Sequence, residues 1–171
     1  LGMAGGSAIL GHSHPEIKKA VETQLKLGSL FTQPNRLAHE YCKIIAPELG
    51  DLSNIVFCST GSEATMRAIR IARAFSGKSK IGIFAGGWHG SHDFLLVEEE
   101  LSSPANKPLP KIKSAGTPRE LLKDILLLPY NQDAALDLIS RHAKELAMVF
   151  IEPVQGSNPR EDIGCFLQKL R

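Results

Sequence analysis

The sequence predicts an α/β fold with a mostly parallel sheet and helices on both faces. Short β-prone runs alternate along the chain with segments of helical periodicity. Several of these runs are apolar at successive positions, which is typical of strands buried on both faces. The composition, with 43% hydrophobic and 22% charged residues, is that of a globular protein. A chain of 171 residues is also long enough to bury a sizeable core.

The first third of the chain is predicted to be a helical lead-in over residues 1–50. Pro15 stands where a first-turn proline is tolerated, and apolar residues then recur at helical spacing until Gly28. A second helix is expected from Leu37 to a stop near Pro47.

The remainder, 51–171, is predicted to be the α/β part and to hold any bound ligand. Its predicted strands are 54–58, 80–84, 124–129 and 147–151. Its predicted helices are 64–77, 135–146 with Asn131 as N-cap, and one that begins near Phe166. Residues 98–118 hold four prolines and little apolar periodicity, so we expect a long mobile loop there.

Charge, cysteine content and hydropathy exclude several classes. The 20 basic and 18 acidic residues leave a net charge of +2, which favours neither a nucleic acid nor an anionic membrane as partner. The three cysteines are widely spaced, which argues against a disulfide framework. No apolar run approaches the ~20 residues needed to span a bilayer. We therefore expect a cytoplasmic protein. The start at Leu1 and the last helical run ending at Arg171 suggest a piece of a longer chain.

Ligands of parallel sheets bind at loops beyond the carboxyl ends of strands, and three loops qualify: 59–62, 85–93 and 153–162. In the first, Thr60, Gly61 and Ser62 open a helix. Free N–H groups and the helix dipole favour an anion at such a position. The alternative is that Ser59, Thr60 or Ser62 only caps the helix, while Glu63 in the first turn satisfies the helix dipole.

The second loop holds Trp88 and His89 among glycines. The indole could stack on a planar ring, or it could plug the end of the sheet. Glu152 ends the strand just before the third loop and could hydrogen-bond a ligand or anchor that loop. A further alternative is a metal site, as in metallohydrolases, built from the histidines His12, His14, His89 and His92.

Taken in order, four segments resemble the class III pyridoxal-phosphate aminotransferases, most closely their glutamate-1-semialdehyde 2,1-aminomutase branch. The resemblance covers nearly the whole chain. The segments are LGHSHP at 10–15, TGSEA at 60–64, GWHG at 87–90 and IEPV at 151–154. Trp88 stands where the family usually has tyrosine, and Ser157 where relatives have Asn or Glu.

The resemblance implies the large domain of the type I aminotransferase fold and pyridoxal 5'-phosphate as cofactor. Thr60, Gly61 and Ser62 would hold the phosphate. Trp88, with His89 beside it, would stack on the pyridine ring. Glu152 and Ser157 would lie near the substituents of that ring.

The same resemblance implies amino-group transfer between small molecules by a homodimer. It places the lysine that forms the Schiff base beyond Arg171, so no catalytic residue is expected within the chain. The expected function is therefore that of an aminotransferase or aminomutase. The alternatives are a noncatalytic fragment or degenerate paralogue that binds a partner and, more remotely, a metallohydrolase.

Overall fold

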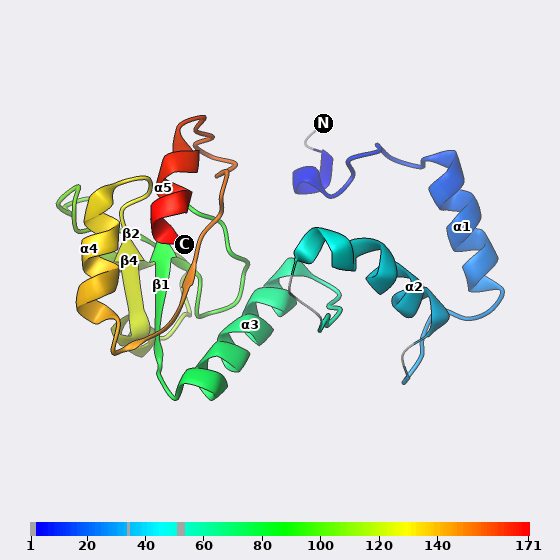
Figure 1. The fold of residues 1–171 in the computed structure, drawn as a ribbon, viewed down its shortest axis with the longest axis horizontal. Coiled ribbons are helices and arrows are strands. Elements are labelled where there is room, and N and C mark those ends of the chain that lie inside the picture. The colour runs from blue at the N-terminus through cyan, green and yellow to red at the C-terminus, as the bar shows by residue number, and fades with distance from the viewer. Residues whose placement is uncertain (1–2, 34, 51–53) are drawn as a thin grey trace. The chain divides into compact units, whose positions relative to one another are not determined.

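The structure is a computed structural model that describes residues 3–33, 35–50 and 54–171, and the chain divides into two compact units (Figure 1). The first unit is Leu1–Val56 and the second is Phe57–Arg171. The division falls a few residues after the predicted boundary at residue 50.

The first unit consists of short helices: η1 (Met3–Gly6), α1 (Pro15–Leu25), α2 (Arg36–Ile45) and η2 (Ala46–Leu49). The two predicted helices are thus confirmed. The Asn35 side chain begins α2 by accepting a hydrogen bond from the N–H of Ala38 at 2.9 Å. Neither α1 nor α2 buries a residue.

The second unit alternates strands and helices: α3 (Gly61–Ser76), β1 (Lys80–Phe84), β2 (Val97–Glu99), β3 (Pro110–Ile112), η3 (Arg119–Asp124), β4 (Ile125–Leu128), α4 (Asp133–His142), β5 (Leu146–Phe150) and α5 (Ile163–Leu170). Its main sheet has the order β4-β1-β5, and both pairings are parallel. Ile83 of β1 lies opposite Leu127 on one side and Phe150 on the other.

Helices cover both faces of this sheet, as predicted. Side chains of successive strand residues point to opposite faces, so Ile83 and Phe84 enter different cores. Ile83 packs in a core that includes Ile69 of α3, and Phe84 packs in a core with residues of α4 and α5. The ring of Phe84 meets that of Phe166 edge-to-face, with ring centroids 5.7 Å apart. The fold class is confirmed.

Two local predictions are wrong. Residues 54–58 are irregular, and Val56 is exposed. A β-prone run forms a strand only where a neighbouring strand completes its ladder, and the main sheet of the described chain consists of β4, β1 and β5. Asn131 has a φ of 57° and does not cap α4. The cap position is Gln132, whose side chain makes no capping bond.

The segment 98–118 contains strand structure that its composition did not predict. β2 and β3 form an antiparallel hairpin in which Glu98 lies opposite Lys111, and their side chains pair at 3.2 Å. The base of the hairpin is fixed because Val97 is buried in the first core. The mobility of the segment stays a prediction.

Candidate functional site

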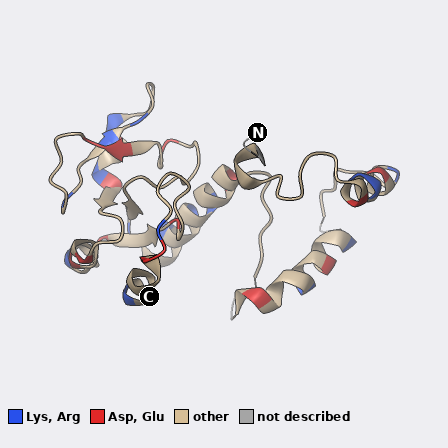
Figure 2. Ribbon diagram, turned by 90° about the horizontal axis from the view of Figure 1, so that it is seen from above, with Lys and Arg blue, Asp and Glu red and all other residues tan. Residues whose placement is uncertain are grey.

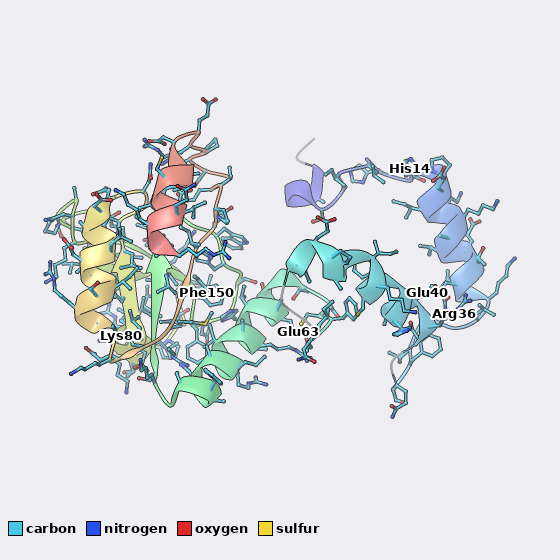
Figure 3. The ribbon with its side chains drawn as sticks, in the orientation of Figure 1. His14, Arg36, Glu40, Glu63, Lys80 and Phe150 are labelled. Atoms are coloured by element: carbon cyan, nitrogen blue, oxygen red, sulfur yellow. The ribbon has the colours of Figure 1, made fainter. Side chains whose placement is uncertain are left out.

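A pocket of about 450 Å³ lies at the carboxyl end of the main sheet, within the second unit. Three segments line it: the first turn of α3, the loop after β1, and the end of β5 with the residues that follow. Figure 3 labels Glu63 on that first turn and Phe150 at the end of β5, whereas Lys80 lies at the amino end of β1. The predicted site residues that line the pocket are Gly61, Ser62, Trp88, His89 and Glu152.

The N-terminus of α3 forms one wall. Thr60 caps the helix by accepting a hydrogen bond from the N–H of Glu63 at 3.1 Å, and Glu63 accepts one from the N–H of Ser59 at 3.0 Å. This bond from Ser59, together with the Arg67 side chain, lowers the pKa of Glu63. By contrast, the N–H groups of Gly61 and Ser62 have no acceptor in the described part of the chain. They lie on the pocket, where they are available to an anion.

The loop after β1 is fastened to this first turn. The hydroxyl of Ser62 accepts a hydrogen bond from the N–H of Ser91 at 3.0 Å. Only a glycine fits where the backbone of this loop passes the backbone of α3, because a Cβ on Gly90 would lie 2.9 Å from the Cα of Ser62. The hydroxyl of Thr65 is 2.8 Å from the carbonyl oxygen of His89 and 3.1 Å from Nε2 of His92. The loop is therefore held to α3 by hydrogen bonds with two side chains of the helix, those of Ser62 and Thr65.

Trp88 and Glu152 also line the pocket. The Glu152 carboxylate accepts one hydrogen bond from the N–H of Trp88 at 3.0 Å and another from the N–H of Gly156 at 3.1 Å. It thus joins the two loops that follow β1 and β5. Trp88 is 60% exposed, although its backbone is fixed by this bond. A large planar face is therefore presented at the pocket.

His89 lies beneath the pocket and is only 8% exposed. Its ring is 5.8 Å from that of Phe150 between centroids, and its Nε2 has no hydrogen-bond partner in the described chain. Burial lowers the pKa of His89, and the nearby Glu152 carboxylate opposes this shift without cancelling it. The imidazole is consequently neutral at pH 7.

Two predicted residues lie outside the pocket. Thr60 faces its own helix as the cap. Ser157 donates a hydrogen bond to the carbonyl oxygen of Gly86 at 3.1 Å and lines a neighbouring cavity of about 260 Å³. Sequence reasoning missed Thr65 and Phe150, which do line the pocket. The position of Thr65, one turn after Ser62 on the same helix face, was the available signal.

The structure offers little to the alternative metal site. Among the described residues, no three His, Cys, Asp or Glu side chains are placed to hold a metal ion.

Figure 2 shows Lys and Arg interspersed with Asp and Glu along the ribbon. Helices long and apolar enough to cross a membrane are likewise not found in 3–33, 35–50 and 54–171.

Comparison with known proteins identifies the family. The sequence model described as Aminotransferase class-III matches residues 2–160. A curated glutamate-1-semialdehyde 2,1-aminomutase of Methanothrix thermoacetophila is 40% identical over 170 residues, which are 99% of this chain and 39% of that protein. The namesake of Methanocella arvoryzae is 39% identical over 156 residues, 91% of this chain and 36% of that protein. The chain therefore spans about two fifths of the length of these relatives.

Solved structures agree. An omega-transaminase from Sphaerobacter thermophilus is 33% identical with a TM-score of 0.83, over 94% of this chain and 38% of that one. A structure described as a transaminase with PLP bound is 27% identical with a TM-score of 0.79, over 93% and 38%. The fold is thus that of pyridoxal-phosphate-dependent transaminases, and the match at residues 2–160 shows that the chain belongs to the class III aminotransferase family.

Proposed function

We propose that this protein binds pyridoxal 5'-phosphate and transfers amino groups, as an aminotransferase or aminomutase, and that this chain holds the phosphate and the ring of the cofactor. One observation carries the proposal: a single pocket joins unpartnered N–H groups at a helix N-terminus to an exposed indole and a neutral, buried imidazole.

The first turn of α3 suits a phosphate. A Cβ added to Gly61 would meet nothing within 4 Å, so the backbone there is open to close approach. The N–H groups of Gly61 and Ser62 and the helix dipole both favour a dianion. The Thr60 hydroxyl accepts from the N–H of Glu63 and the Glu63 carboxylate accepts from the N–H of Ser59. Because neither bond uses the N–H of Gly61 or Ser62, the cap and the phosphate site do not compete.

Trp88 and Glu152, which line the same pocket, suit a pyridine ring. The Trp88 indole offers a flat apolar face, and Glu152 fixes the backbone from which it projects. A volume of about 450 Å³ is within the usual range of small-molecule sites. Bound pyridoxal phosphate acts as an electron sink for the carbon that carries the transferred amino group.

The chain's own residues bind and orient. Gly61 and Ser62 hold the anion, Trp88 sets the plane of the ring, and His89 adds no positive charge to the pocket at pH 7. The relatives named glutamate-1-semialdehyde 2,1-aminomutase make glutamate 1-semialdehyde the first compound to test. The donor and the acceptor of the amino group are small molecules in this proposal, and the protein is a cytoplasmic homodimer.

The test uses a matched pair of variants in the phosphate site. The full-length protein, with the Schiff-base lysine that the family resemblance places beyond Arg171, is purified and incubated with pyridoxal phosphate and glutamate 1-semialdehyde, and NMR follows the position of the amino group. Gly61→Asp adds a carboxylate that the helix tolerates but that repels phosphate, whereas Gly61→Asn adds nearly the same volume without charge. We expect Gly61→Asp to reduce transfer at least about tenfold more than Gly61→Asn. Equal rates in both variants, or no transfer of any amino group by the wild type, would contradict the proposal.

A further inference from the structure

Lys113 stands on a part of the fold that the class III motifs do not cover. It directly follows β3, and its N–H donates to the carbonyl oxygen of Leu96 at 3.0 Å, which extends the β2–β3 ladder by one bond. Leu95 and Val97, on either side of Leu96, are buried in the first core. The backbone of Lys113 is therefore fixed, and only its side chain is free to turn.

The Lys113 side chain reaches the only tryptophan of the chain. Its ammonium lies over the Trp88 ring, 5.3 Å from the centroid. Attraction between a cation and an indole face extends to about 6 Å. Lys111, two residues earlier on the same hairpin, instead pairs with Glu98 at 3.2 Å. Lys113 forms no ion pair within the described chain, so the indole is the group that it contacts.

The indole lacks other restraints. Trp88 is 60% exposed, and the described residues place no second aromatic ring against it. The hydrogen bond to Glu152 fixes its backbone but leaves both side-chain torsions free. A freely turning ring loses conformational entropy whenever a ligand stacks on it, and this loss weakens binding.

Lys113 approaches Trp88 from outside the pocket. The side chains that line the pocket include Trp88 but not Lys113. The ammonium lies over one face of the indole, so a ligand ring that stacks on Trp88 would use the other face. We propose that Lys113 is a positioning residue that holds the plane of Trp88 for ring stacking, and that the β2–β3 hairpin is in this way part of the cofactor site. This inference rests on the proposed function, which has Trp88 stack on the cofactor.

The fluorescence of Trp88 tests the contact without any cofactor, since no other tryptophan contributes in the 171-residue chain. Quenching by acrylamide measures access to the indole. Calorimetry measures the binding of pyridoxamine 5'-phosphate. This compound has the ring and the phosphate of the cofactor, but no carboxylate and no aldehyde that would react with lysine side chains. The variants are Lys113→Gln, Lys113→Arg and Lys111→Gln, the last of which removes the same charge from the same hairpin. Circular dichroism confirms that each is folded.

We expect Lys113→Gln to raise the acrylamide quenching constant and to weaken pyridoxamine phosphate binding about threefold. Lys113→Arg should keep the quenching constant and the affinity close to those of the wild type, because a guanidinium also stacks on an indole. Lys111→Gln leaves the quenching constant unchanged and weakens binding less. Wild-type quenching and affinity in Lys113→Gln would overturn the inference. Equal effects of Lys113→Gln and Lys111→Gln would also overturn it, because they would show that the loss of positive charge matters and the contact with Trp88 does not. Failure of the wild type to bind pyridoxamine phosphate would overturn the proposed function, and the positioning role with it.

Discussion

The two units contrast in how they are stabilised. The second unit buries apolar side chains from strands and helices in two cores, one on each face of the sheet. In the first unit, α1 and α2 carry apolar stripes at helical spacing, yet Val21, Leu25 and Ile44 remain exposed. Amphipathic periodicity is thus sufficient to predict a helix, but burial of the stripe is what stabilises it.

The contrast also explains where a site can be built. A binding pocket needs groups held in fixed positions by packing and hydrogen bonds. In the second unit the first turn of α3 and the loops after β1 and β5 are joined by bonds from Ser62, Thr65 and Glu152. Four predictions test this contrast.

The largest effect is expected in the core of the second unit. Phe84 is 1% exposed and packs against Phe166, so Phe84→Ala should lower the free energy of unfolding by about 3–5 kcal/mol. Urea denaturation followed by circular dichroism measures this. A loss below about 1 kcal/mol would mean that the sheet does not depend on this core.

The next effect concerns the fastening of the loop to α3. Gly90 has a φ of 112°, and any Cβ there would meet the backbone of Ser62. Gly90→Ala should therefore destabilise the unit by about 1–3 kcal/mol and weaken pyridoxamine phosphate binding. Gly116→Ala is the matched control, since Gly116 also has positive φ but has open space around its Cβ position. If only the control lost affinity, the loop contact would not shape the pocket.

A smaller effect depends on pH. Burial lowers the pKa of His89 below its ordinary value of 6.5, so the unfolded chain binds more protons than the folded one just below that pH. The contribution of the neutral ring is fully present above pH 6.5 and is lost as the pH falls towards the folded pKa. The free energy of unfolding of the wild type should therefore decline between pH 7 and pH 5. We expect His89→Gln to reduce the slope of this decline, by less than about 1.4 kcal/mol per pH unit. Parallel pH profiles of variant and wild type would contradict this.

The smallest effect is expected in the first unit. Ile44 is 70% exposed, so Ile44→Ala should change the free energy of unfolding of the chain by no more than about 0.5 kcal/mol. The same urea titration provides the measurement. A loss as large as that of Phe84→Ala would show that the stripe of α2 is buried in solution, and the contrast between the units would fail.

The sequence predicted those parts of the fold that depend on local pattern. The predicted strands 80–84, 124–129 and 147–151 appear as β1, β4 and β5, and Gly77 ends α3 in the left-handed conformation. The run 54–58 was predicted wrongly because strand formation depends on a neighbour, which local composition does not encode.

The same distinction applies to the pocket. Gly61, Ser62 and Trp88 are visible as a helix start and an aromatic in a glycine-rich loop. The contact between Lys113 and Trp88 is not visible, because it depends on the pairing of β2 with β3 across a proline-rich segment. The role of Glu152 in joining two loops likewise depends on tertiary structure, although its place at a strand end marked it as a candidate.

The central claim is that the first turn of α3 and the Trp88 face form one site for a phosphorylated pyridine. Calorimetric titration of the wild-type chain with pyridoxamine 5'-phosphate and, separately, with pyridoxamine tests it most directly, because the two compounds differ only in the phosphate. We predict saturable binding of the phosphate ester at one site, at least about tenfold tighter than binding of pyridoxamine. Equal affinities, or no binding of either compound, would contradict the account.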